Sequence, residues 1–361
     1  MKRLTVFLDG TWQRLTQSDP TNIAKLAQSV AHSDAKGVSQ IVFYNAGVGA
    51  MTVTDKAEKP LISGITGEGL DENLTAAYQF LSWNYTTGDE VYIFGFSRGA
   101  FTARSLCGLI RSGGLLHRPY MDMTQQAYQH YRDRQHPDSD AATTFRRNYS
   151  YDPIPIAYVG LFDTVGQLGV PMSINRGKYK FHDLNLSSRV KSARQACALD
   201  EDRAVFPLTP WENLDDLNEK AGYRPDDPAA PYQQRWFPGG HGEVGGGTGS
   251  MLSNIPLRWI AEGAARTGLA FTAETCPLAL YSRPEYQNPL ADWTPPTGML
   301  NLAGRRARVL KKYKKQIKPS PEDISIMLTE AALARWRAES LAPRYRPKAL
   351  KALTKFIDEI G

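Results

Sequence analysis

The sequence predicts an α/β fold, a mostly parallel sheet with helices on both faces, and three observations support this prediction. The chain contains five short apolar, β-prone runs, at residues 4–8, 41–46, 91–95, 154–162 and 233–237. Helical periodicity lies between these runs, most clearly over 68–86. Runs of this length suit strands that are buried on both faces, and their alternation with helices indicates βαβ units.

The first run, LTVFL, is short and stops at Asp9. A secretory signal would need a longer apolar stretch, so this run is predicted to be the first strand of the sheet. No apolar run approaches the roughly 18 residues that a membrane-spanning helix needs. The sequence therefore predicts a soluble, cytoplasmic protein and leaves export by a specialised secretion system open.

Composition narrows the function classes further. The three cysteines, Cys107, Cys197 and Cys276, are widely spaced and odd in number, which indicates a reducing compartment rather than a disulfide framework. The net charge is +6, but residues 305–318 hold eight basic residues and no acidic one, so the remainder of the chain is close to neutral. The positive charge is therefore local, and we expect no nucleic-acid partner, no metal ion and no cofactor.

The third run, VYIF, leads into the turn GFSRG, and helical spacing follows. Strand, tight turn, serine and helix form the nucleophile elbow of α/β-hydrolases. Gly95 and Gly99 suit this motif, because the serine has a strained backbone and neighbouring main chains approach where a side chain would clash. Ser97 is therefore the predicted nucleophile. The structural alternative is a serine that only caps the following helix.

The fourth run ends at Asp163, where a turn begins in the sequence GLFDTVGQLG. Carboxylates at the carboxyl ends of parallel strands face the site crevice, so Asp163 is the predicted acid of a catalytic triad. The alternative is an aspartate that forms the turn or caps a helix. Asp200 and Asp202 are weaker candidates, because ALDEDR is predicted to be the end of an exposed helix.

A serine nucleophile needs an imidazole base, and in this fold the histidine comes last along the chain. His241 follows the fifth run and opens a glycine-rich loop, GGHGEVGGG, so it is the predicted base; an incidental histidine in such a loop is the alternative. The other histidines after Ser97 suit this role less well. His117, His130 and His136 come before any strand that could supply the acid, and His182 is predicted to lie at the start of a helix.

The oxyanion that forms during acyl transfer needs two backbone N–H donors. Arg98, the residue after the nucleophile, supplies one in this fold. Gly10 and Thr11 follow the first strand and are the predicted source of the second.

Two polar segments interrupt the βαβ pattern, at about 117–150 and 207–232, and are predicted to be lid-like insertions at the edge of the sheet. The predicted catalytic domain covers 1–304, and 305–361 is predicted to be a basic helical C-terminal appendage. Apolar residues recur at near-helical spacing in the basic stretch, which predicts an amphipathic helix that packs on the domain or contacts an anionic membrane through residues 305–318.

With these motifs in place, the sequence resembles the bacterial α/β-hydrolases labelled domain of unknown function 2235, which include the catalytic domain of type VI secretion phospholipase effectors. The matching segments are FLDGTW, GDEVYIFGFSRGAFTAR, VGLFDTVGQLG, ALDEDRAVF and GGHGEVGGG. They occur in order over most of residues 1–265. The resemblance implies Ser97 as nucleophile, Asp163 as acid and His241 as base.

The leading functional hypothesis is a serine esterase or lipase that cleaves carboxylic esters through an acyl-enzyme. Lipid or phospholipid is the substrate class that the resemblance implies. Two alternatives remain open at this point: a metal-dependent hydrolase that uses Asp9, Asp163 and His241, and a non-catalytic scaffold that binds a partner through residues 305–318.

Overall fold

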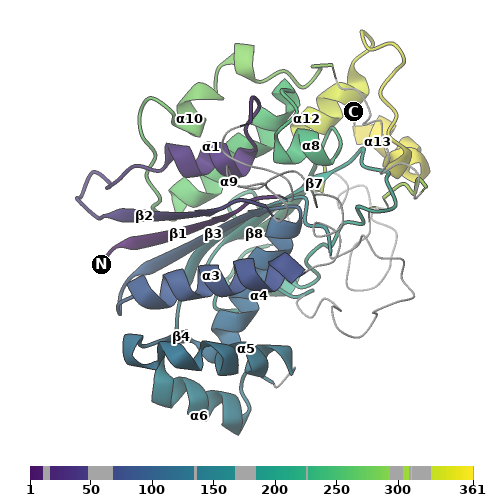
Figure 1. Cartoon of the computed structure of the whole chain (residues 1–361). Coiled ribbons are helices and arrows are strands. Elements are labelled where there is room, and N and C mark those ends of the chain that lie inside the picture. The colour runs from purple at the N-terminus through teal and green to yellow at the C-terminus, as the bar shows by residue number, and fades with distance from the viewer. Residues whose placement is uncertain are drawn as a thin grey trace, which may run out of the picture.

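A parallel sheet forms the centre of the molecule (Figure 1). The computed structural model describes residues 1–10, 17–47, 68–133, 136–166, 184–224, 227–292, 304–308, 310 and 327–360. Within these residues the six strands of the sheet follow the order β2-β1-β3-β6-β7-β8, and every neighbouring pair is parallel. The strands are β1 (Arg3–Leu8), β2 (Gln40–Asn45), β3 (Glu90–Phe96), β6 (Ile156–Phe162), β7 (Ala193–Ala198) and β8 (Tyr232–Phe237).

The five predicted runs are strands of this sheet, and the predicted fold class is confirmed. β7 is not among the predicted strands, because its sequence ARQACA carries two polar side chains. Arg194 donates to the Trp259 carbonyl at 2.5 Å, and the Gln195 amide donates to Gln234 on the neighbouring strand at 2.7 Å. These groups are therefore satisfied inside the fold by partners that the local sequence does not reveal.

Helices cover both faces of the sheet (Figure 1). α1 (Asn22–Ser29) and α9 (Asn254–Arg266) lie on one face, against aromatic side chains such as Phe7, Phe94 and Tyr158. α3 (Glu68–Asn84) and α4 (Arg98–Gly113) lie on the other face, against mostly aliphatic side chains. Burial on both faces explains why β1, β3 and β6 read as continuous apolar runs.

The first insertion lies outside α3 and α4 rather than at the sheet edge (Figure 1). It contains η1 (Arg118–Met123), α5 (Thr124–Arg132) and α6 (Asp140–Tyr149), and a short antiparallel pair, β4 (Leu115–Leu116) with β5 (Ser150–Tyr151), closes it. Since α4 runs back from the carboxyl end of β3, its last turn, where the insertion begins, lies toward the amino ends of the strands. The predicted lid-like position is therefore wrong for this segment. The second insertion contains α7 (Leu214–Lys220).

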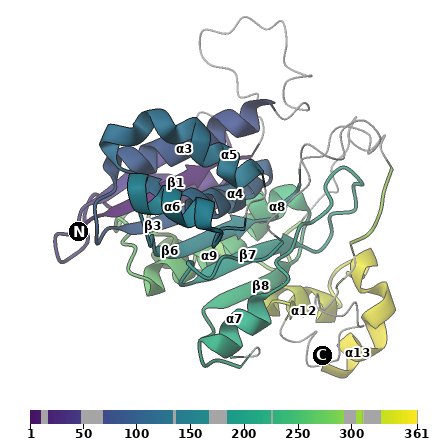
Figure 2. The ribbon, with the colours of Figure 1, turned by 90° about the horizontal axis from the view of Figure 1, so that it is seen from below.

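The chain after β8 packs back onto the sheet. It forms α8 (His241–Gly245), η2 (Met251–Ser253), α10 (Pro277–Leu280), η3 (Pro284–Tyr286), α12 (Glu330–Arg337), η5 (Lys348–Leu353) and α13 (Thr354–Ile360). We call the described residues after 303 the C-terminal segment. Leu328 forms a parallel bridge with Trp236 of β8, and α12 lies beside that strand (Figure 2). α12 and α13 bury a cluster of apolar side chains with Cys197 and Trp236 of the sheet.

The predicted basic amphipathic helix falls mainly on residues outside the described ranges, which include Lys311, Lys312, Lys314 and Lys315. Of its described part, Arg305 forms an isolated bridge with Arg203, and Arg308 is buried. The described part of residues 305–318 is therefore not a solvated helix. None of the helices in the described ranges is both long enough and apolar enough to cross a membrane.

Candidate active site

The site lies where the order of strands reverses. From β1 the chain goes to β2 on one side and then crosses to β3 on the other, so that β1 and β3 are neighbours whose following segments diverge. Such a switch point opens a crevice at the carboxyl ends of the two strands. Gly10 follows β1 there and Ser97 follows β3, and a side-chain carbon on Gly10 would lie 3.4 Å from Cβ of Ser97.

The turn around Ser97 has the geometry of a nucleophile elbow. Ser97 has φ 58° and ψ −122°, a conformation that non-glycine residues rarely adopt. A Cβ on Gly95 would lie 2.6 Å from Cα of Ala100, and one on Gly99 would lie 2.1 Å from the carbonyl oxygen of Leu8. Both glycines are therefore required, since the first turn of α4 packs directly against β1 and β3.

Ser97 does not use its side chain to cap α4. Its Oγ lies 2.8 Å from Nε2 of His241 instead, and Nδ1 of the same imidazole lies 2.6 Å from Oδ2 of Asp163. An ionised carboxylate can only accept, so Nδ1 carries the proton and Nε2 is left to accept from the serine hydroxyl. The structure thus brings the three residues predicted as nucleophile, acid and base into one buried hydrogen-bonded chain.

Asp163 directly follows β6 and is held by the neighbouring strand β7. Its backbone N–H donates to Ala196 at 2.7 Å, and its Oδ1 accepts from the N–H of Ala198 at 2.8 Å. Its φ of 42° turns the carboxylate out of the strand direction. The end of β7, next to the stretch ALDEDR that is predicted to end an exposed helix, is therefore what fixes the acid.

His241 is the first residue of α8, so the predicted glycine-rich loop is partly helical. The imidazole packs between the rings of Phe96 and Phe206, with centroid distances of 4.7 and 4.8 Å. Its backbone N–H donates to Glu201 at 3.2 Å. α8 is anchored in turn by Asn22, whose amide donates to the Val244 carbonyl at 2.9 Å. Ring packing and these two bonds hold the imidazole toward Ser97.

A buried arginine contacts the acid of this hydrogen-bonded triad. Arg308 donates from Nη1 to Oδ1 of Asp163 at 2.6 Å and from Nη2 to Oδ2 at 2.9 Å. Both side chains are buried. Burial acts to raise the pKa of Asp163, but the charges and hydrogen bonds of Arg308 and His241 outweigh it and hold this pKa well below its usual range.

The predicted oxyanion donors are only partly in place. Arg98 begins α4, which puts its backbone amide at a helix N-terminus beside Ser97. The N–H of Gly10 donates to Oδ1 of Asp9 at 2.7 Å, so in this structure it serves the loop after β1 rather than an oxyanion. Thr11 lies outside the described residues.

The weaker acid candidates have other partners. Oδ2 of Asp200 accepts from the backbone of Gly239 and the hydroxyl of Tyr345, both at 2.6 Å, and Asp202 pairs with Lys348 at 2.8 Å. ALDEDR is therefore not the end of an exposed helix: Ala198 ends β7, and the carboxylates that follow tie the loop to other segments. Among the other candidate bases, His117, His130 and His136 all belong to the first insertion, and His182 is outside the described residues.

The donor set for a metal site does not assemble. Asp9 accepts hydrogen bonds from Gly10, Thr21 and Tyr44 rather than joining Asp163 and His241. In the part of the chain that the structure describes, no three His, Cys, Asp or Glu side chains converge as metal ligands would. The described residues therefore do not place Asp9 together with Asp163 and His241 as ligands of one metal ion.

Two residues at the site were missed by sequence reasoning. The segment ALDEDRAVF was noticed, but Glu201 in its centre was not recognised as a support for the His241 backbone. Arg308 lies in a run of basic residues, and nothing in such a run distinguishes a buried arginine from its solvated neighbours. Only the burial that the fold imposes identifies it.

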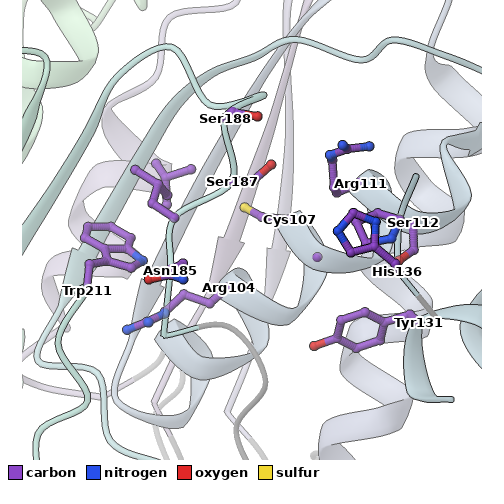
Figure 3. Close-up of a pocket in the computed structure, with 14 residues that line it drawn as sticks. Arg104, Cys107, Arg111, Ser112, Tyr131, His136, Asn185, Ser187, Ser188 and Trp211 are labelled. Carbon is purple, nitrogen blue, oxygen red and sulfur yellow. The ribbon is translucent and has the colours of Figure 1, made fainter. Parts of the chain in front are cut away.

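A cavity of about 440 Å³ lies along the later half of α4 (Figure 3). Arg104, Cys107 and Arg111 of the helix line it, together with His136 of the first insertion and Trp211. The Arg104 guanidinium donates to the Thr209 carbonyl at 2.7 Å, and that of Arg111 pairs with Asp138 at 2.6 Å. Neither Ser97, Asp163 nor His241 lines this cavity, so it is separate from the site.

Known proteins match parts of this chain. An uncharacterized protein of Saccharomyces cerevisiae is 32% identical over 224 residues, a match that covers 57% of this chain and 32% of the yeast protein. The crystal structure of an uncharacterized protein from Pseudomonas aeruginosa aligns with TM-score 0.42 and 17% identity over 76% of this chain and 47% of its own. The Tle1 effector bound to the VgrG spike of the type 6 secretion system aligns with TM-score 0.39 and 19% identity, over 70% and 52% of the two chains.

The chain thus spans about a third of the yeast relative and about half of each solved structure. The family model described as the catalytic domain of T6SS Tle1-like phospholipase effectors matches residues 2–263. This range runs from the start of β1 to α9 and contains the elbow, Asp163 and His241. Because the match takes in well over half of its residues, the chain belongs to the family of Tle1-like phospholipase effector catalytic domains.

Proposed function

We propose that this protein is a serine hydrolase that cleaves carboxylic esters of lipids, with phospholipids as the substrate class. The observation that carries the proposal is the hydrogen-bonded chain from Ser97 through His241 to Asp163 at an elbow after β3. Membership of a family described as phospholipase effectors supports the lipid substrate. The assignment to the hydrolases labelled domain of unknown function 2235 rests on the same motifs and is part of this proposal.

The proposed reaction has two halves. In the first, Oγ of Ser97 attacks the ester carbonyl while Nε2 of His241 takes the hydroxyl proton, and the imidazolium is stabilised through Nδ1–H by Asp163. The tetrahedral intermediate then expels the alcohol, which leaves with the proton from Nε2, and the acyl group remains on the serine. In the second half a water molecule attacks the acyl carbonyl while it loses a proton to Nε2. The bond between the acyl group and Oγ then breaks, Oγ takes the proton back from Nε2, and the fatty acid is released. The rings of Phe96 and Phe206, which pack against the imidazole, support this proton transfer because they help to keep Nε2 directed at Ser97.

The deciding experiment combines covalent labelling with turnover. We expect a fluorophosphonate probe to label the wild-type protein on Ser97, and the protein to release fatty acid from phospholipid in mixed micelles. Ser97→Ala should abolish labelling and lower turnover at least about 1,000-fold, because the covalent step is lost. It should leave the melting temperature near that of the wild type, since the hydroxyl contributes no helix cap.

Ser105→Ala is the matched control, because Ser105 is another buried serine on the same helix. It should retain labelling and turnover. Wild-type protein that neither labels nor cleaves any phospholipid or short-chain ester would reject the enzymatic proposal and favour the non-catalytic scaffold.

A further inference from the structure

The triad acid is bound by a residue from far along the chain. Arg308 donates hydrogen bonds to both carboxylate oxygens of Asp163, which lies 145 residues earlier in the sequence. Its two terminal nitrogens are also fixed by backbone carbonyls, Nη1 by Ala198 at 2.8 Å and Nη2 by Phe206 at 2.9 Å. The guanidinium is thus held in one orientation by the end of β7 and by the loop after it, which also supplies the ring against His241.

This arrangement has a geometric consequence for the carboxylate. Oδ2 of Asp163 accepts hydrogen bonds from Nδ1 of His241 and Nη2 of Arg308, while Oδ1 accepts from Nη1 of Arg308 and the Ala198 N–H. Four donors from three different segments leave the carboxylate no freedom to rotate. The planar fork of an arginine fits both oxygens at once, which a lysine cannot do.

It also has an electrostatic consequence. A carboxylate with no cation beside it in so buried a place would tend to take up a proton, and a protonated acid no longer fixes the imidazole tautomer. Two other carboxylates lie beside this pair. Glu201 is paired with Arg203 at 2.6 Å, and Glu243 accepts a hydrogen bond from the N–H of Gly240, the residue before α8. Arg308 is the cation that contacts the Asp163 carboxylate and offsets its charge.

From this geometry we propose that Arg308 is a positioning residue of the reaction: it holds the Asp163 carboxylate in place and charged toward His241, so that the C-terminal segment completes the active site. The proposal rests on the proposed function, since it assigns Arg308 a part in the same proton transfer. It also goes beyond the matched catalytic domain, because residue 308 lies outside residues 2–263.

The test is the pH profile of Arg308→Met with a soluble short-chain ester, with active sites counted by the fluorophosphonate probe. We expect kcat per labelled site to fall about 100-fold, because the acid is no longer held in place, and KM to change little. Removal of a nearby positive charge makes the pair of Asp163 and His241 hold its extra proton more tightly. The acidic limb of kcat/KM should therefore move to higher pH by about one unit.

Two further variants separate charge from geometry and from folding. Arg308→Lys keeps the charge but not the fork, so it should lose roughly tenfold in kcat per site while its acidic limb stays near that of the wild type. Arg305→Met removes the ion pair between Arg305 and Asp202 in the same segment. It should change neither kcat per labelled site nor the pH of the acidic limb.

An Arg308→Met protein with wild-type kcat per site and an unmoved acidic limb would overturn the proposal, even if fewer of its molecules could be labelled, because the residue would then only support the fold. If Arg308→Met does not fold, Arg308→Lys provides the test. A wild-type value of kcat per site in the lysine variant would also overturn the proposal. Failure of the wild type to react with the probe would instead reject the proposed function itself, and this proposal with it.

Discussion

Ser97 and Asp163 are the two residues other than glycine with positive φ in the described ranges, at 58° and 42°. Each such conformation costs on the order of 1–3 kcal/mol and persists only where the surroundings enforce it. The Ser97 N–H donates to Phe162 at 3.0 Å, one residue before Asp163, so the two strained positions are directly linked. The spacing between nucleophile and acid is thus set by the fold before any substrate binds.

Gly99 is the residue on which this strained turn depends most directly. A Cβ there would lie 2.1 Å from the carbonyl oxygen of Leu8 and 2.5 Å from that of Asp9, and a main chain inside a sheet cannot easily move away. We expect Gly99→Ala to destabilise the protein by at least about 3 kcal/mol, at the upper end of overpacking effects, and to abolish labelling of Ser97. Chemical denaturation followed by tryptophan fluorescence would measure the loss.

Gly166→Ala is the matched control for that variant. Its nearest neighbour would be Oγ1 of Thr209 at 3.6 Å, an ordinary contact, and the position has no left-handed backbone. It should change the free energy of unfolding by less than about 1 kcal/mol. Equal stability of the two alanine variants would show that α4 does not pack as closely on β1 as described.

Among the secondary-structure elements, those with a local sequence signal were predictable and those that depend on distant partners were not. β3 is apolar after Glu90, β6 is apolar throughout, and each is followed by a turn residue, so both the strands and the positions of Ser97 and Asp163 could be derived from the sequence. β7 carries Arg194, whose partners on α9 come about 65 residues later. The same reason hides Arg308, because its acid partner lies 145 residues away.

The loop after β7 joins the sheet to the C-terminal segment through Asp200. Burial raises the pKa of Asp200 to about 6, against the lowering effect of its hydrogen bonds from Tyr345 and Gly239. Because the folded value lies above that of the unfolded chain, this group favours folding below about pH 4 and its contribution is lost as the pH rises to about 6. A difference of about two pKa units corresponds to roughly 3 kcal/mol.

Asp200→Asn should therefore gain in stability relative to the wild type as the pH rises from 4 to 7, by up to about 3 kcal/mol. Urea unfolding of both proteins at several pH values measures the difference. Asp202→Asn should show the opposite trend, and at lower pH, below about pH 4. Burial tends to raise the pKa of Asp202, but Lys348 and Arg305 outweigh it and lower this pKa, so the wild-type carboxylate stabilises the fold more as the pH rises. A constant difference between wild type and Asp200→Asn would contradict the description of Asp200 as a buried, proton-binding group.

The C-terminal segment is part of the folded core of the molecule. Trp236, Cys197 and Leu199 of the sheet side are almost completely buried, and α12, η5 and α13 supply their apolar neighbours. Ion pairs from Asp202 to Arg305 and Lys348, together with the bond from Tyr345 to Asp200, fasten the same segment to the loop after β7. The described residues of the predicted C-terminal appendage are packed on the domain, because they share a hydrophobic cluster with the sheet.

Removal of residues 305–361 tests this directly. Exposing large buried side chains such as Trp236 and Leu199 costs about 1.5–3 kcal/mol each, and together this approaches the 5–15 kcal/mol that holds a typical domain folded. The shortened chain would also leave Asp163 buried without its cation. We expect it to lose cooperative thermal unfolding, to bind a hydrophobic dye and to fail to react with the fluorophosphonate probe. Arg344→Ala, in an exposed ion pair of the same segment, should melt like the wild type. A truncated protein that melts cooperatively at the wild-type temperature would show instead that the sheet and its helices are stable without the C-terminal segment, and that the contacts of Trp236 add little to folding.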